Sequence, residues 1–308
     1  MKIAILDRAT LGNDVDVSIF EQFGELIVYD MTSEEQTQDR VKDVDIVLTN
    51  KVVINSSHMD NSTMKLICIT ATGMNNVDLQ YANQKDIAVK NVAGYSSSSV
   101  AQVAFSMIFH FVTKLDYYKS YVDNGNWQKS PIFTHIDKPF YELDNKRVGV
   151  IGLGDIGRNF ARKAKAFDCE VVYYSTSGKN SNSEYKRVEL DELLSTSDII
   201  SIHCPLNENT QDLLNYENMS KMKDKAILLN LGRGGIINEE DLAKILDEKE
   251  IYAGIDVVSK EPILEDNPLL KVQNKQRLLL TPHIGWASIE ARTRLLEMVA
   301  DNIREFLK

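Results

Sequence analysis

The amino-acid sequence predicts an α/β protein made of two domains, each organised around a parallel β-sheet. Short apolar runs alternate with helical patterns through most of the chain, which is typical of parallel strands joined by crossover helices. A glycine-rich turn follows one of these runs only at residue 152, so a second α/β unit begins near the middle of the sequence. The 308 residues suffice for two domains of ordinary size.

Short apolar runs define the expected strands of both sheets. In the first domain we expect strands at Lys2–Leu6, Glu25–Tyr29, Ile46–Thr49, Leu66–Thr70 and Ala88–Lys90. In the second domain we expect strands at Arg147–Ile151, Glu170–Tyr174, Ile199–His203, Ala226–Leu231, Tyr252–Asp256 and Leu278–Thr281.

Three further segments connect or complete the two sheets. The serine run that begins at Ser96 marks the start of a long helix through Phe111. The segment Asp123–Leu143 is irregular and aromatic, and a loop of this length usually has a function: it either packs on a partner subunit or covers its own core. The last helix, Ser288–Leu307, has an apolar face that is expected to return to the first domain.

Composition argues against several classes of function. The formal net charge is -10 and the basic residues form no run, which argues against nucleic-acid binding. The longest apolar stretches, such as Ala101–Val112, are too short to span a bilayer, and the N-terminus resembles a strand rather than a signal peptide. Cys68, Cys169 and Cys204 are widely spaced in apolar surroundings, so we expect neither disulfides nor a metal site, and a cytoplasmic location.

The turn at the start of the second domain has the sequence Gly152-Leu153-Gly154-Asp155-Ile156-Gly157, and a helix from Arg158 to Phe167 is expected after it. The first glycine permits a tight turn, the second lets the backbone approach a pyrophosphate, and the third lets the helix pack closely on the strand. A second apolar run follows at the distance that one βαβ unit requires. The sequence therefore predicts a Rossmann-like dinucleotide site in which the phosphates meet the first N–H groups of the helix.

Polar residues follow three later strands of the second domain, where open α/β sheets bind ligands. They lie in the segments Asn230–Gly235, Gly254–Pro262 and Thr281–Trp286. Reduction of a 2-keto acid needs a hydride donor, a cation for the carboxylate and an acid for the carbonyl oxygen. Arg233 suits the cation, His283 suits the acid, and Glu261 would fix the histidine ring. Taken singly, each of these residues also suits a structural role.

Together these motifs resemble the D-isomer-specific 2-hydroxyacid dehydrogenase family over almost the whole chain. The matching segments are Ala71–Asp78, Gly152–Gly157, His203–Leu206, Asn230–Gly235, Asp256–Pro262 and Pro282–His283. The resemblance implies an NAD- or NADP-dependent oxidoreductase with Arg233, Glu261 and His283 as its catalytic set. It also implies two Rossmann-like domains, with a discontinuous substrate domain of residues 1–97 plus 284–308 and a dinucleotide-binding domain of residues 98–283.

The resemblance further assigns residues to the two ligands. Near the substrate carboxylate it implies the Gly73 and Met74 backbone amides together with Arg233, and Lys51 is either a second positive contact or an exposed lysine at a strand end. Asp256 is implied to lie near the nicotinamide carboxamide. The expected cofactor contacts are Gly152, Gly154, Asp155, Ile156, Gly157, Ser175, His203, Cys204, Pro205, Thr210, Leu231, Gly232, Arg233, Asp256, His283 and Gly285.

One position departs from the family pattern. The second strand of a dinucleotide domain usually ends in Asp or Glu, which binds the adenosine ribose, and Ser175 stands there instead. Without a carboxylate nothing repels a 2′-phosphate, and Ser175, Thr176, Ser177 and Lys179 are able to hydrogen-bond one. Ser175 is equally able to bind the ribose hydroxyls of NAD, so the sequence leaves NAD and NADP open.

Within the family, the aromatic segment Trp127–Leu143 and the run His283–Ser288 resemble the glycerate dehydrogenase or hydroxypyruvate reductase branch. This branch implies reduction of hydroxypyruvate or glyoxylate to D-glycerate or glycolate, and a homodimer. Two alternatives stay open: a reductase of other 2-keto acids, and a dinucleotide-sensing interaction protein that resembles the transcriptional corepressors of this fold. We expect neither nucleic acid nor membrane as a partner.

Overall fold

The computed structural model describes residues 1–179 and 181–308, and these divide into two compact units. Unit 1 contains Met1–Ser96 and Trp286–Lys308, and unit 2 contains Ser97–Gly285. The α/β class, the two parallel sheets and the discontinuous first domain are confirmed. The chain passes from one unit to the other at residues 96/97 and 285/286, compared with the predicted 97/98 and 283/284.

Unit 1 is organised around a five-stranded sheet in the order β2-β1-β3-β4-β5, in which all neighbouring strands are parallel. Its strands are β1 (Lys2–Ile5), β2 (Glu25–Val28), β3 (Ile46–Thr49), β4 (Leu66–Ile69) and β5 (Ala88–Lys90). Its helices are α1 (Glu34–Val41), α2 (Ser56–Asp60), α3 (Leu79–Gln84) and α10 (Ile289–Phe306), with the 3-10 helices η1 (Arg8–Leu11) and η2 (Ser18–Phe23).

Both faces of the unit 1 sheet are covered. Ile3 and Ile5 pack on one side with Leu295 of α10, whereas Ala4 and Val47 pack on the other side with the residues of α1, α2 and α3. Successive side chains of a strand enter the cores on opposite faces of the sheet. The strands are therefore apolar along their whole length. The last helix therefore belongs to the first domain, as its apolar face predicted.

Unit 2 has, among its described residues, a sheet in the order β12-β11-β10-β9-β6-β7-β8, again with parallel neighbours. Its strands are β6 (Arg147–Ile151), β7 (Glu170–Tyr174), β8 (Lys186–Arg187), β9 (Ile199–Ile202), β10 (Ile227–Asn230), β11 (Tyr252–Ile255) and β12 (Leu278–Leu280). Its helices are α4 (Ser97–Thr113), α5 (Leu115–Asp123), α6 (Asp155–Ala166), α7 (Leu190–Thr196), α8 (Tyr216–Met219) and α9 (Glu239–Glu248), with the 3-10 helices η3 (Trp127–Lys129), η4 (Pro268–Lys271) and η5 (Lys275–Arg277).

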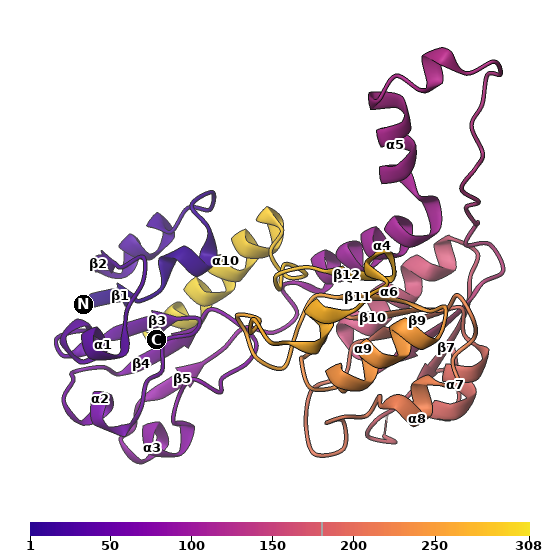
Figure 1. The fold of residues 1–308 in the computed structure, drawn as a ribbon. Coiled ribbons are helices and arrows are strands. Elements are labelled where there is room, and N and C mark those ends of the chain that lie inside the picture. Colours follow the sequence, from indigo (N-terminus) through magenta and orange to yellow (C-terminus); the bar gives the residue numbers. More distant parts are fainter. Residues whose placement is uncertain (180) are drawn as a thin grey trace. The chain divides into compact units, whose positions relative to one another are not determined.

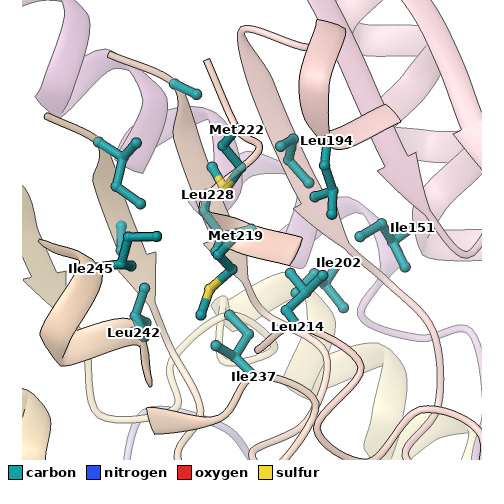
Figure 2. Packing of buried hydrophobic residues seen from close by; sticks show 14 of the residues in the cluster. Ile151, Leu194, Ile202, Leu214, Met219, Met222, Leu228, Ile237, Leu242 and Ile245 are labelled. Atoms are coloured by element: carbon teal, nitrogen blue, oxygen red, sulfur yellow. The ribbon is translucent and has the colours of Figure 1, made fainter. Parts of the chain in front are cut away.

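Helices also cover both faces of the unit 2 sheet. On one face α4 and α6 meet, with the rings of Phe105 and Phe160 5.1 Å apart. On the other face Figure 2 shows Met219 of α8 and Leu242 of α9 packed with Leu228 of β10. The carboxyl ends of all these strands share one edge of the sheet, so residues that follow different strands are brought to the same edge.

Several predicted elements need small corrections. Most predicted strands are one residue too long at their carboxyl end, so that Leu6, His203 and Asp256 lie just beyond β1, β9 and β11. The helix after the glycine turn begins at Asp155 rather than Arg158, because Gly154 is already its N-cap residue. Strand β8 was not predicted, since its two charged residues give no apolar signal.

The arm, which we define as α5 and residues 124–143, projects from the body of unit 2 (Figure 1). Helix α5 buries none of its residues. The aromatic side chains of Trp127, Phe133 and Phe140 are exposed, Phe133 by 88%. The last residue of the arm, Leu143, is buried in the core of the unit, but the large exposed side chains show that the arm leaves this core largely uncovered, which argues against one of the two roles predicted for it.

The described part of the chain lacks two features. None of its helices combines the length and the apolar character needed to cross a membrane, and it contains no group of three or more His, Cys, Asp or Glu side chains placed to hold a metal ion. Cys68, Cys169 and Cys204 are buried free thiols.

Candidate active site

The glycine turn joins β6 to α6, and each of its glycines meets a different constraint. Gly152 has a φ of +92°, and a Cβ there would lie 2.7 Å from the backbone nitrogen of Cys204. A Cβ at Gly157 would collide with the carbonyl oxygen of Gly152, whereas a Cβ at Gly154 would meet nothing within 4 Å. The first and third glycines thus permit packing inside the domain, and the second borders open space.

This turn fits the phosphates of a dinucleotide. The N-cap residue of α6 is Gly154, which has no side chain to cap the helix, so the first N–H groups are available to an anion. Asp155 would repel an anion, but its carboxylate is paired with Arg158 at 2.6 Å. Burial raises the pKa of the neighbouring Cys204 thiol to about 11, so this wall of the turn is uncharged at neutral pH.

Ser175 follows β7 directly and is buried, and its Oγ has no hydrogen-bond partner among the described residues. An unpaired buried hydroxyl is unfavourable, and a ribose hydroxyl or a phosphate oxygen would satisfy it. The residues around it include no carboxylate from 174 to 179, and Ser177 and Lys179 are exposed. Arg187 of β8, which sequence reasoning missed, donates from Nη1 to the Gly178 carbonyl oxygen at 2.9 Å and adds a second cation to this turn.

The loop after β9 is held by its own side chains. The hydroxyl of Thr210 donates to the Pro205 carbonyl oxygen at 2.7 Å and accepts the Asn207 N–H at 2.8 Å. The ring of His203 lies 5.2 Å from that of Phe160, with Nε2 2.9 Å from the Ser201 hydroxyl. Its Nδ1 is buried and has no partner in the described part of the chain.

Burial lowers the pKa of His203 from its usual 6.5 to about 3, because a buried imidazolium is poorly solvated. The unfolded chain therefore binds this proton at a higher pH than the folded chain does, and stability falls as the pH drops below 6.5. Between about pH 7 and about pH 5 we expect wild type to lose about 2 kcal/mol more than the His203→Gln variant.

Urea unfolding midpoints of both proteins at the two pH values measure this difference. The same loss of stability in wild type and His203→Gln would show that His203 does not titrate in this way.

Asn230, the last residue of β10, shapes the turn that carries Arg233. Its Nδ2 donates to the Arg233 carbonyl oxygen at 2.9 Å, and its Oδ1 accepts the Gly232 N–H at 3.1 Å. A Cβ at Gly234 would collide with the backbone of Val258, so this turn lies directly against the segment after β11. The Arg233 side chain is exposed, with Nη1 bonded at 2.8 Å to the Gly232 carbonyl oxygen.

Glu261 and His283 come from different loops and form a hydrogen-bonded pair. Nδ1 of His283 lies 2.8 Å from Oε2 of Glu261, and the Val258 N–H donates to the other carboxylate oxygen at 3.2 Å. Because a carboxylate only accepts, Nδ1 carries the proton in this pair. Both side chains are about one third exposed, which leaves Nε2 as the ring nitrogen for proton exchange with a substrate.

Asp256 fixes the turn on which His283 stands. Its buried carboxylate accepts from the Thr281 hydroxyl at 2.6 Å, the Ile284 N–H at 2.8 Å and the Gly285 N–H at 2.7 Å. The His283 N–H donates to the Asp256 carbonyl oxygen at 2.9 Å, and His283 has a φ of +53°. This orienting contact was not predicted, and the implied contact of Asp256 with nicotinamide stays a prediction.

The other predicted substrate residues lie in unit 1. Lys51 follows β3, and Gly73 and Met74 follow β4, so all three are at the carboxyl edge of that sheet. The two loops are joined by Asn76, whose Nδ2 donates to the Val52 carbonyl oxygen at 3.0 Å. The structure thus gathers the predicted residues at one edge of each unit.

Comparisons with known proteins show the family to which the chain belongs. Residues 105–285 match the model of the D-isomer specific 2-hydroxyacid dehydrogenase, NAD binding domain. The chain is 40% identical to a hydroxypyruvate reductase of Blautia hydrogenotrophica over 100% of this chain and 97% of the relative. It is 32% identical to a glycerate dehydrogenase of Methylorubrum extorquens over 99% of this chain and 96% of the relative.

Among solved structures, an acyclic imino acid reductase in complex with NADPH and D-Arg is 28% identical, with a TM-score of 0.85 over 100% of this chain and 97% of that chain. The glycine turn, the Glu261–His283 pair and these matches lead to one assignment. The chain belongs to the D-isomer-specific 2-hydroxyacid dehydrogenase family and is an NAD(P)-dependent oxidoreductase that acts on a CH–OH group.

Proposed function

We propose that this enzyme reduces hydroxypyruvate to D-glycerate and glyoxylate to glycolate, and catalyses the reverse reactions. Relatives named hydroxypyruvate reductase, glycerate dehydrogenase and glyoxylate reductase support this substrate class. The observation that carries the proposal is the 2.8 Å contact between His283 and Glu261. This contact joins the proposed proton donor, His283, to the carboxylate of Glu261 at the edge where parallel sheets bind ligands.

Each member of the catalytic set has a distinct role in this proposal. When bound, reduced nicotinamide supplies the hydride for the carbonyl carbon. Arg233 holds the substrate carboxylate with its planar guanidinium and polarises the carbonyl oxygen. His283 donates a proton from Nε2 to that oxygen, and Glu261 stabilises the imidazolium through Nδ1. Lys51 and the backbone amides of Gly73 and Met74 add contacts to the substrate.

For the cofactor, we propose that the N–H groups at the start of α6 bind the pyrophosphate and that Ser175 binds at the adenosine ribose. The remaining predicted contacts, from the loops after β9, β10, β11 and β12, complete this set. The Ser175 hydroxyl, which has no partner among the described residues, and the absence of a carboxylate from residues 174 to 179 are compatible with both NAD and NADP. The three free thiols suit a reducing compartment, and we propose the cytoplasm.

A substrate panel with both reduced cofactors tests the proposed function. Purified enzyme is mixed with hydroxypyruvate, glyoxylate, pyruvate and branched or aromatic 2-keto acids, and the absorbance of NADH or NADPH is followed. We expect kcat/KM to be highest for hydroxypyruvate or glyoxylate. A higher value for a branched or aromatic acid would reassign the substrate, and oxidation with none of them would contradict the proposal.

We also infer a homodimer formed through the arm. Besides its exposed aromatic rings, the arm exposes Ile132 and Ile136 by 61% and 73%. Apolar exposure of this extent is typical of a surface that is buried by a partner. The arm is internally ordered, since the rings of Tyr121 and His135 stack 3.6 Å apart. A second copy of the chain presents the same surface, which suits a two-fold interface.

Sedimentation velocity tests this inference. We expect a dimer for wild type and a monomer for the Phe133→Asp variant, because a carboxylate buried without a partner disfavours the interface. The Met31→Asp variant introduces the same charge at another exposed apolar position, 66% exposed, and should remain dimeric. A monomeric wild type, or a dimeric Phe133→Asp variant, would exclude the arm as the interface.

A further inference from the structure

Asp7 follows Leu6, the first residue after β1. Its carboxylate accepts hydrogen bonds from four groups of a single turn. It accepts the backbone N–H groups of Asn50 at 2.9 Å, Lys51 at 2.7 Å and Val52 at 3.3 Å. It also accepts the Thr49 hydroxyl at 3.1 Å. Asp7 is only 3% exposed, so this charge is satisfied almost entirely by the turn that follows β3.

Three consecutive N–H groups that converge on an anion form a nest, and hydrogen bonds to an ionised acceptor are roughly twice as strong as neutral ones. The shortest backbone bond goes to Lys51. This fixes the Cα of Lys51 relative to β1, while its side chain is exposed. A buried charge is unfavourable unless it is fully paired. A buried carboxylate is therefore not needed merely to close a turn.

A second set of hydrogen bonds connects this turn to the loop that follows β4. Nδ2 of Asn76 donates to the Val52 carbonyl oxygen at 3.0 Å, and the Ile54 N–H donates to the Asn76 carbonyl oxygen at 2.8 Å. The Val77 N–H in turn bonds to the Met74 carbonyl oxygen at 3.1 Å. The turn held by Asp7 is therefore connected to the loop of the proposed substrate amides.

We propose that Asp7 is a positioning residue that holds Lys51 in place to bind the carboxylate of the 2-keto acid. This inference rests on the proposed function, because it needs Lys51 to contact the substrate. Asp7 itself touches neither substrate nor cofactor in this account. Its effect on the reaction passes through the backbone of the Lys51 turn.

A double-mutant cycle on Asp7 and Lys51 tests this role. Thr49, Asn50, Lys51 and Val52 all donate to the same oxygen, Oδ2. Asp7→Asn keeps the shape of the side chain but removes its charge, so these bonds go to a neutral amide oxygen and are weaker. We expect Asp7→Asn and Lys51→Met each to raise KM for hydroxypyruvate about tenfold, which corresponds to roughly one net hydrogen bond, with little change in kcat or in KM for the cofactor. The double variant should be no worse than Lys51→Met alone.

Asp45→Asn is the matched control. Asp45 lies at the opposite end of β3, where its carboxylate accepts the Lys2 N–H at 2.9 Å, so the same chemical change is made on the same pair of strands. We expect this variant to have the wild-type KM. If Asp7→Asn does not fold, Thr49→Val removes one donor to the same carboxylate and should raise KM by a smaller factor, again only when Lys51 is present.

The outcomes separate this inference from the proposed function. Wild type that reduces no 2-keto acid contradicts the proposed function. Active wild type whose KM is unchanged by Asp7→Asn, or an Asp7→Asn effect that persists undiminished with Met at position 51, contradicts only the positioning role. A rise in KM for Asp45→Asn equal to that for Asp7→Asn would show a general effect on the sheet and would also overturn it.

Discussion

Replacement of His283 by Asn is expected to lower kcat for keto-acid reduction by about a hundred- to ten-thousandfold, the usual contribution of a general acid. Asn retains a polar group near the position of Nδ1, so the contact with Glu261 can be kept while the titratable Nε2 is lost. The KM for NADH or NADPH should change little. Glu261→Gln should lower kcat less, because the ring remains and only the stabilisation of the imidazolium is lost.

His110 provides a matched control for His283. It also contacts a carboxylate, with its Nδ1 3.1 Å from Oδ2 of Asp116, but it lies on α4 away from the carboxyl ends of the strands. We expect His110→Asn to retain wild-type kcat. A His283→Asn variant with full activity would remove the proposed general acid and with it the assigned mechanism.

Replacement of Arg233 by Met is expected to lower kcat/KM by about a hundred- to a thousandfold, the usual effect of removing one group that stabilises charge at the reacting oxygen. We expect kcat to fall and KM to rise, because the guanidinium is proposed to hold the carboxylate and to polarise the carbonyl. Arg233→Lys should recover only part of the loss, since an ammonium keeps the charge but cannot form two parallel hydrogen bonds.

Steady-state kinetics of both variants with hydroxypyruvate provide the measurement. Arg304→Met is the control, because Arg304 lies on α10 and pairs with Asp301 on the same helix. Full recovery by Arg233→Lys would mean that only charge is needed, and an active Arg233→Met variant would contradict the proposed anchor.

The order of elements was largely predictable because it depends on local patterns. Continuous apolar runs indicated the buried strands, and the glycine turn indicated where the second sheet begins. Several strand ends were predicted one residue too long: His203 and Asp256 lie just past the last residues of β9 and β11. Strand β8 escaped prediction because Lys186 and Arg187 lie at a sheet edge and carry no apolar pattern.

The contacts that orient the candidate site were less predictable, because they join residues far apart in the sequence. The bond of Asp7 with Lys51 and that of Asp256 with Gly285 span 44 and 29 positions. Neither aspartate has a local motif that indicates its partner. Asn230 is different: an Asn followed two residues later by glycine is typical of a turn held by its side chain, so this signal was present.

The product formed from hydroxypyruvate tests the central claim most directly. Chiral chromatography of a completed reaction, with the oxidised nicotinamide measured in the same sample, identifies both the acid and the stoichiometry. We predict one D-glycerate for each reduced cofactor consumed, and far less D-glycerate with His283→Asn over the same time. Formation of L-glycerate, or cofactor oxidation without glycerate, would contradict the account.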